Sequence, residues 1–189
     1  MMSAAVNPGR ILLINKPLHW TSFDVVNKLR YKLKTTKIGH AGTLDPLATG
    51  LLIICVGKMT KRIDEFMGLE KEYTGKFVIG KTTPSHDLET PVNSEKDISH
   101  ITPEAIEETA KTFRGEISQL PPQHSAIRIK GKGAYEYARE GKEIELVARN
   151  VSVTAFDIVK VSLPEVNFRI VCSKGTYIRS LVRDFGIVL

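Results

Sequence analysis

The sequence GHAGTLDPLATG occupies residues 39–50, and the rest of the chain is organised around it. Three glycines, one proline and two threonines in twelve residues are typical of a shaped loop and not of a helix or strand. The loop is not a polar linker, because Leu44 and Leu47 flank its carboxylate, Asp45, and an apolar run over residues 51–56 follows at once. The stretch therefore predicts a rigid, partly apolar turn that presents one acid.

Asp45 is the only acidic residue between Asp24 and Asp64. Its neighbours in sequence include the cations Lys34, Lys37, Lys58, Lys61 and Arg62. Residue type alone favours a turn former whose oxygens accept backbone N–H groups. The alternative is an acid or nucleophile at the mouth of an anion-binding cleft.

Length and composition indicate an ordinary globular protein. The chain has 189 residues, 42% hydrophobic and 25% charged, which suits one well-filled core. No apolar run approaches the ~18 residues that span a bilayer, and the first twenty residues show no signal-peptide pattern. Cys55 and Cys172 both lie in apolar runs, so we expect buried thiols, no disulfide and a cytoplasmic location.

Charge is distributed unevenly along the chain. Residues 1–81 carry 13 Lys and Arg against 6 Asp and Glu, residues 82–126 carry 3 against 8, and residues 127–189 carry 11 against 7. Two basic segments separated by an acidic one are consistent with a face that binds a polyanion, with the middle segment turned away. Charge alone does not separate nucleic acid from a generic basic surface.

Periodicity predicts the main elements. Strands are expected over residues 10–15, 51–56 and 71–80, and two further β-rich runs over residues 151–172 flank a turn at Leu163–Glu165. Helices are expected from Thr21 or Ser22 to about Leu33, from Thr60 to about Met67, from Thr102 to about Phe113, and around Tyr135–Glu140. Residues 81–101 are polar and predict a long mobile connection.

Residues Gly75–Thr82 match the phosphate-loop pattern G-x-x-x-x-G-K-[ST]. A phosphate loop follows a strand and opens a helix, whereas residues 77–79 here are strand formers and residues 83–87 continue as a loop. We therefore reject a nucleotide site at this position.

Three dense motifs occur in order: GHAGTLDPLATGLL from Gly39, QLPPQHSA over Gln119–Ala126 followed by Lys130-Gly131, and SKGTYIRSLVRDFG from Ser173. Together with an N-terminal Lys16-Pro17 pair, they resemble the tRNA pseudouridine synthase B (TruB) family over most of residues 10–186. The chain departs from the family at residues 82–87. Where the family carries a T-D-T-D-like pattern, only Asp87 is acidic here, so no RNA contact is assigned to that stretch.

The resemblance implies an α+β fold with a mixed, mostly antiparallel β-sheet, flanking helices and a catalytic cleft across its middle. It implies an isomerase that converts uridine to pseudouridine at position 55 of the TΨC loop, with the T-arm of tRNA as partner and no cofactor or metal. The sequence shows no metal-ligand spacing, and we expect a monomer. We expect one catalytic domain over residues 1–189 with no additional RNA-binding domain. It should be incomplete at its C-terminal end, because family members continue further.

The resemblance also implies roles for individual residues. Asp45 is the catalytic carboxylate, Arg179 is suited to hold the Asp45 carboxylate bidentately, and Tyr73 is placed to stack on the flipped uracil. Three further residues are expected to contact the substrate: His40 against a displaced base, Tyr177 at the pocket wall, and Lys16 on phosphates together with a basic helix face. By type alone, Arg179 would be a surface arginine, Tyr73 a strand aromatic and His40 a satisfied loop residue.

Three alternatives stay open. One is a related guide-RNA-dependent synthase that acts within a multiprotein particle. Another is a non-catalytic tRNA chaperone that remodels the T-arm. The third, a P-loop nucleotide hydrolase, rests only on the Gly75–Thr82 match, which its context disfavours.

Overall fold

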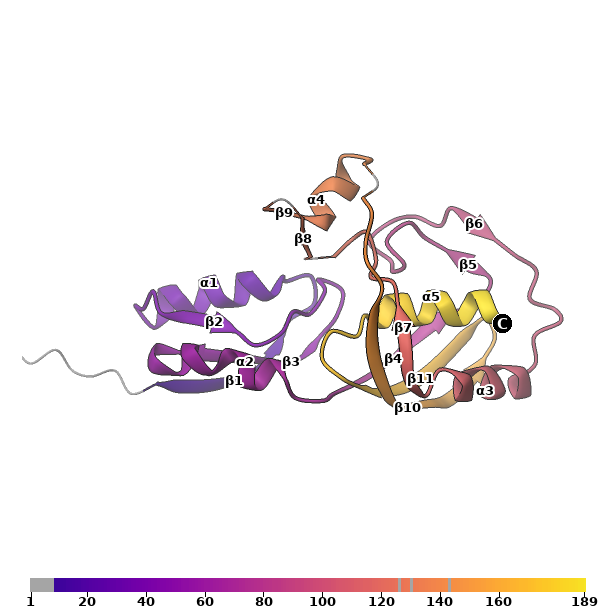
Figure 1. Ribbon diagram of the computed structural model, residues 1–189, viewed down its shortest axis with the longest axis horizontal. Coiled ribbons are helices and arrows are strands. Elements are labelled where there is room, and N and C mark those ends of the chain that lie inside the picture. Colours follow the sequence, from indigo (N-terminus) through magenta and orange to yellow (C-terminus); the bar gives the residue numbers. More distant parts are fainter. Residues whose placement is uncertain (1–8, 126, 130, 143) are drawn as a thin grey trace, which may run out of the picture. The chain divides into compact units, whose positions relative to one another are not determined.

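A computed structural model describes residues 9–125, 127–129, 131–142 and 144–189. Ala126 and Lys130, which belong to the predicted QLPPQHSA motif and the pair that follows it, lie outside these ranges, as do the first eight residues. The chain divides into two compact units, Met1–Leu69 and Glu70–Leu189, coloured indigo to magenta and magenta to yellow in Figure 1. We predicted one catalytic domain over residues 1–189, which would require the two units to act together. This stays a prediction.

The first unit is a three-stranded antiparallel sheet with α1 (Ser22–Lys32) on one face. The strand order is β1 (Arg10–Lys16), β3 (Gly50–Val56) and β2 (Ile38–His40). A short 3₁₀ helix, η1 (Gly57–Arg62), and α2 (Ile63–Met67) follow β3. The core between sheet and helix consists of Val25, Val26, Ile38, Leu52, Ile54 and Val56.

Helix α1 begins where the sequence predicts, because Thr21 caps it. The Asp24 N–H donates to Thr21 Oγ1 at 3.0 Å, and the Thr21 N–H donates to Asp24 Oδ2 at 2.8 Å. This reciprocal arrangement satisfies two of the N–H groups that a helix leaves unpaired at its start. The cap fixes where the chain turns from β1 into α1, and this junction contacts the Asp45 loop described below.

The second unit is a four-stranded antiparallel sheet in the order β4–β11–β10–β7. Its strands are β4 (Lys71–Val78), β11 (Glu165–Cys172), β10 (Arg149–Ser162) and β7 (Gly115–Gln119). Helices α3 (Pro103–Thr112) and α5 (Ile178–Val188) lie beside this sheet (Figure 1). Together they provide Ile106, Ala110, Leu181 and Phe185 to the buried core.

Phe185 of α5 is the centre of an aromatic cluster. Its ring centroid lies 5.2 Å from that of Phe77, 5.4 Å from Phe156 and 5.9 Å from Phe113. Burial of one such side chain stabilises a fold by roughly 1.5–3 kcal/mol. The cluster therefore anchors α5, whose first turn carries Arg179, to strands β4 and β10.

Smaller elements complete the second unit. Strands β5 (Lys81–Thr82) and β6 (Ser94–Glu95) pair with each other, as do β8 (Arg128–Ile129) and β9 (Lys132–Gly133), and α4 (Ala134–Arg139) follows β9. The region predicted as one long connection over residues 81–101 thus contains a short antiparallel pair. β4 runs into a turn at Gly80 (φ 83°) and then into β5, not into a helix, which agrees with rejecting the phosphate loop.

The predicted fold class is confirmed: helices pack on sheets whose paired strands, throughout the described residues, are antiparallel. The expected sheet corresponds to two larger sheets, one in each unit. Cys55 and Cys172 are buried free thiols, as predicted. Within the described residues, no helix has the length and apolar character needed to cross a bilayer.

Candidate active site

The Asp45 loop joins β2 to β3 in the first unit and turns on two glycines. Gly42 and Gly50 have φ values of 110° and 120°, a backbone region that residues with a side chain rarely adopt. The Ala48 N–H donates to the Asp45 carbonyl oxygen at 3.0 Å and closes a tight turn. Asp45 itself is half-buried. The predicted shaped loop is therefore present, with the carboxylate at its turn.

The backbone on both sides of Asp45 is attached to the start of α1. The buried Ser22 hydroxyl accepts the Leu44 N–H at 2.9 Å and donates to the Leu44 carbonyl oxygen at 3.3 Å. The Pro46 carbonyl oxygen accepts the His19 N–H at 2.8 Å. Both residues adjoining Asp45 are thereby fixed, so the carboxylate projects from a rigid support, as a catalytic group requires.

Lys16, at the end of β1, is fully buried with 0% of its surface exposed. Its ammonium donates to the carbonyl oxygens of Pro17 at 2.9 Å, Trp20 at 2.5 Å and Pro46 at 3.3 Å. An ammonium has three donors, and all three are used. These contacts give Lys16 a structural role, and its predicted contact with phosphates stays a prediction. Lys16 is buried because carbonyls from two loops converge on it, and it holds the segment before α1 to the Asp45 loop.

The Lys16 charge also acts on the loop. Burial lowers the pKa of the Lys16 ammonium, and the negative charges of Asp45 and Asp24 oppose this by raising it. Lys16 thus supports the predicted catalytic carboxylate through its contact with the backbone of Pro46.

We expect the substitution Lys16→Met to lower the free energy of unfolding by about 2 kcal/mol, because it leaves buried carbonyl oxygens without a donor. Urea denaturation of parent and variant measures this difference. The same change at Lys28, an exposed position of α1, is the matched control and should leave stability within ~0.5 kcal/mol. Equal effects of the two substitutions would contradict a structural role for Lys16.

His40 ends β2, and its ring faces its own loop. Nδ1 lies 2.6 Å from the Gly42 carbonyl oxygen, so Nδ1 carries the proton and donates. This bond orients the imidazole and fixes its tautomer. The contact of His40 with a displaced base stays a prediction.

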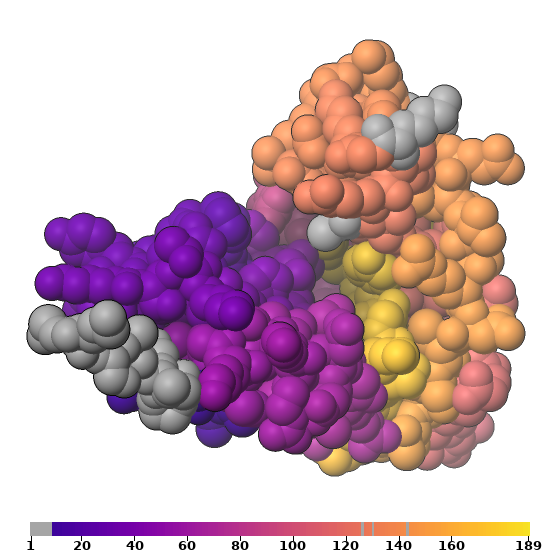
Figure 2. All heavy atoms as spheres, turned by 60° about the vertical axis from the view of Figure 1, so that its left-hand side comes forward, coloured from indigo at the N-terminus to yellow at the C-terminus, as the bar shows by residue number. Residues whose placement is uncertain are grey.

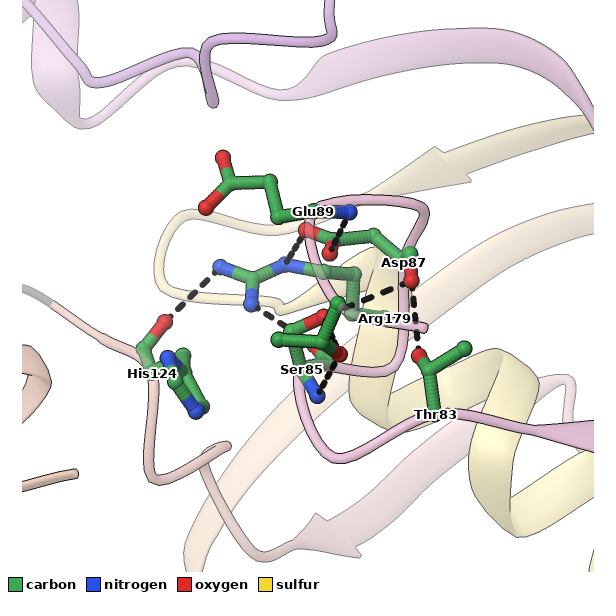
Figure 3. Close-up of polar contacts among 7 residues, drawn as sticks. Thr83, Ser85, Asp87, Glu89, His124 and Arg179 are labelled. Carbon is green, nitrogen blue, oxygen red and sulfur yellow. Dashed lines mark hydrogen bonds and ion pairs between the residues drawn. The ribbon is translucent and has the colours of Figure 1, made fainter. Parts of the chain in front are cut away.

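Arg179 lies in the first turn of α5 in the second unit and ties three segments together (Figure 3). Its Nη1 donates to the Ser85 carbonyl oxygen at 3.0 Å and its Nη2 to the His124 carbonyl oxygen at 2.9 Å. Its Nε lies 3.7 Å from Asp87 Oδ2, with 14% and 17% of the two side chains exposed. Arg179 is therefore a half-buried structural junction and not the surface arginine that its type alone suggests.

The loop over residues 83–90 is organised around Asp87 (Figure 3). The hydroxyls of Thr83 and Ser85 donate to the Asp87 carbonyl oxygen at 2.7 and 3.3 Å. The Glu89 N–H donates to Asp87 Oδ1 at 2.9 Å. No RNA contact was expected at residues 82–87, because this stretch departs from the family pattern. The one acid that the stretch keeps is the acid that faces Arg179.

Tyr177 is the residue before α5, and a buried side chain holds its backbone. The Tyr177 N–H donates to Gln119 Oε1 at 2.8 Å, and Gln119 Nε2 donates to the Tyr177 carbonyl oxygen at 3.1 Å. Gln119 is 2% exposed at the end of β7. This two-point contact fixes the start of α5 and hence the position of Arg179. The role of Tyr177 as a pocket wall stays a prediction.

Tyr73 lies on β4 opposite Ile170 of β11. It is half-buried and packs against the core of the second unit. Stacking of Tyr73 on a flipped uracil stays a prediction.

His86 gives the Arg179 region a pH dependence that can be measured. Burial lowers the pKa of the His86 imidazole, and the positive charges of Arg183 and Arg179 lower it further, against smaller opposing effects of Asp184 and Asp87. The unfolded chain therefore binds the proton more readily than the folded chain. As the pH falls below the ordinary histidine value of about 6.5, protonation favours unfolding.

We expect the parent to lose stability between pH 7.5 and 5.5 and His86→Asn to lose less, because asparagine cannot be protonated and tolerates the φ of 57° at this position. Urea denaturation at both pH values measures the difference. His19→Asn is the control, since His19 is exposed and has a φ of 64°. An identical pH dependence in parent and His86→Asn would refute the assignment.

Each unit holds half of the predicted site. Lys16, His40 and Asp45 belong to the first unit, and Tyr73, Tyr177 and Arg179 to the second. The catalytic roles of these residues stay predictions. Among the described residues, no group of three or more His, Cys, Asp or Glu is placed to hold a metal ion.

Comparison with known families decides the assignment. A model of the TruB family pseudouridylate synthase N-terminal domain matches residues 30–178. The chain belongs to this TruB family. The matched range contains the Asp45 loop, the 83–90 loop and the Gln119 contact, and it ends one residue before Arg179.

Curated relatives in the TruB family extend over almost the whole chain. A protein of Flavobacterium johnsoniae, named tRNA pseudouridine synthase B, is 56% identical over 94% of this chain and 81% of its own length. A protein of the same name from Parabacteroides distasonis is 52% identical over 96% of this chain and 80% of its own.

Solved structures show the same fold. The crystal structure of a Cbf5–Nop10–Gar1 complex contains a chain that matches 95% of this one with a TM-score of 0.71 and 27% identity. An H/ACA RNP bound to a substrate RNA containing 2′-deoxyuridine matches with a TM-score of 0.67 and 25% identity. This chain covers 44% and 42% of those chains, less than half of their length.

Three supporting residues escaped the sequence analysis. Ser22 was considered only as a helix cap, although it holds the Asp45 loop. Gln119 was part of a quoted motif and received no role. Asp87 is the one acid that residues 82–87 keep, and this retention was the available signal.

Proposed function

We propose that this chain isomerises uridine to pseudouridine in tRNA, with the uridine at position 55 of the T-arm as its target. Membership of the TruB family supports this activity. The relatives that are at least half identical over more than nine-tenths of the chain carry the name tRNA pseudouridine synthase B.

The observation that carries the proposal is the support around Asp45. Its loop is held by Ser22 on one side and by His19 and Lys16 on the other. A carboxylate that only formed a turn would not need both of its neighbours in the chain, Leu44 and Pro46, to be held by separate segments. This arrangement suits an acid that must stay charged and precisely oriented while it reacts.

The reaction needs one carboxylate and leaves the composition of the nucleotide unchanged. The C1′–N1 glycosidic bond breaks, the uracil rotates, and C5 bonds to C1′; the proton leaves C5 and N1 gains a proton. Asp45 can act as the nucleophile at C1′ or as the base that removes the C2′ proton. The uridine must leave its stack to reach the carboxylate.

A guide-RNA-dependent synthase is the second candidate, because the solved structures above are titled as Cbf5 complexes and an H/ACA RNP. Identity to those chains is 25–27%, against 49–56% for six of the relatives named tRNA pseudouridine synthase B. The sequence is therefore closer to the enzymes named for tRNA.

The test is tritium release from tRNA transcribed with [5-³H]uridine, because the hydrogen on C5 is lost when C5 bonds to C1′. Purified protein alone should release about one equivalent from unmodified tRNA and none from a transcript with cytidine at position 55. Release that appears only with an added guide RNA would favour the second candidate. No release under either condition would refute isomerisation.

A further inference from the structure

A basic hollow lies in the first unit, and none of its lining residues belongs to the Asp45 loop. It encloses about 480 Å³ at the C-terminal end of α1 and is lined by Arg30, Tyr31, Lys32, Lys34, Thr35 and Thr36. Hydrogen bonds shape this turn, since the Lys34 N–H donates to the Tyr31 carbonyl oxygen at 3.3 Å and the Thr35 N–H to that of Arg30 at 3.2 Å. Lys34 takes a φ of 48°, which folds the segment sharply back.

The charge of this region is not compensated. Residues 25–44 contain five Lys and Arg and no Asp or Glu. Within the described residues, none of the five forms an ion pair, whereas in the second unit Lys76 pairs with Glu165 and Lys81 with Glu95. The negative end of the α1 dipole amounts to about half a charge, which is small against five cations.

The hollow combines a fixed cation, Arg30, with an exposed aromatic ring, Tyr31. The Arg30 guanidinium is held by a hydrogen bond from Nη1 to Asn27 Oδ1 at 3.1 Å and lies 5.9 Å from the centre of the Phe23 ring. Its Nε is buried without an acceptor in the described part of the chain. Tyr31 is 84% exposed, an unusual position for a large aromatic side chain. Cations beside an exposed ring are the combination that binds single-stranded nucleic acid.

We propose that this basic hollow binds the RNA substrate at a second point, with Lys32 and Lys34 on backbone phosphates and Tyr31 against an unstacked base. The proposal rests on the proposed function for the identity of the RNA. The polypeptide chain connects the basic hollow to the Asp45 loop. Residues 33–37 lead directly into β2. The Gly57 N–H donates to the Lys37 carbonyl oxygen at 2.7 Å, which ties the segment after the hollow to the residue that follows β3.

The experiment compares two double variants that each remove two positive charges. Lys32→Gln with Lys34→Gln changes the hollow; Lys96→Gln with Lys160→Gln changes two exposed lysines of the second unit. Binding to unmodified tRNA is measured between 0.05 and 0.3 M salt. Each lost phosphate contact removes ~0.7–0.9 from the log–log slope, so the hollow variant should show a slope shallower by ~1.4–1.8 and about 30-fold weaker binding at 0.1 M.

The control variant should bind within about threefold of the parent. Tyr31→Leu should weaken binding about tenfold without changing the slope, because stacking is not ionic. A hollow variant with parental affinity and slope, or one no weaker than the control, would overturn the proposal. If the parent binds tRNA but isomerises none, the proposed function fails while the binding comparison still decides the inference.

Discussion

The substitution Asp45→Asn should abolish isomerisation while leaving tRNA affinity nearly unchanged. Asparagine keeps the size of the side chain and its ability to form the turn, and the loop is held by backbone contacts of Leu44 and Pro46 that it does not alter. Only the charge and the nucleophilic or basic oxygen are lost. We expect turnover to fall by more than about 10⁴-fold, or roughly 5.4 kcal/mol of barrier. Tritium release under single-turnover conditions and filter binding measure the two quantities.

Asp64→Asn is the matched control for this experiment. Asp64 is an exposed acid on α2 of the same unit, so the same chemical change should leave turnover within about twofold. Substantial turnover by Asp45→Asn would return Asp45 to the role of a turn former. Weakened tRNA binding would instead indicate that the carboxylate, or the loop shape that it maintains, contributes to substrate contact.

Local signals explain why much of the fold was predictable. Thr21 and Thr102 cap α1 and α3 as expected, since a hydroxyl followed by a helix-forming run satisfies the first N–H groups. Strand β2, by contrast, has three residues and exists because it pairs with β3. Such a strand has too few residues for a periodic pattern, so the sequence analysis merged it with the loop.

The expected helix from Thr60 begins earlier and differently. η1 starts at Gly57 as a 3₁₀ turn, and its continuation α2 covers Ile63–Met67. Gly57 has a φ of 63° and donates to Lys37 of the neighbouring segment. This contact across the first unit, and not helix propensity, fixes where the turn begins.

Lys16 shows why the site was less predictable than the fold. A lysine at the end of a strand is ordinarily exposed, and its neighbours in sequence give no reason to bury it. The burial depends on Pro46, thirty residues further on, whose carbonyl oxygen completes the set of three acceptors. Asp87 was missed for a similar reason, because its partner Arg179 lies in another motif. Long-range acceptors of this kind leave no local pattern.

The Arg179→Lys variant should fold and bind tRNA normally, yet its turnover rate should fall about 10²-fold. This corresponds to an activation free energy higher by about 2.7 kcal/mol. The guanidinium reaches Ser85, His124 and Asp87 at once because its donors diverge in one rigid plane. An ammonium on a flexible stem keeps the charge but cannot bond three segments in these directions. The 83–90 loop and the start of α5 would then lose their common anchor, and groups that the reaction requires would be misplaced.

Arg183→Lys, one turn further along α5, provides the control. Arg183 also contacts a backbone carbonyl, that of Leu120 at 3.3 Å, and pairs with the adjacent Asp184. Because it does not join the 83–90 loop in these contacts, its replacement should change turnover less than threefold. Single-turnover rates separate the predicted loss from a change in binding. If Arg179→Lys keeps activity within a few-fold of the parent, positive charge at this position is sufficient and the geometry of the guanidinium is not required.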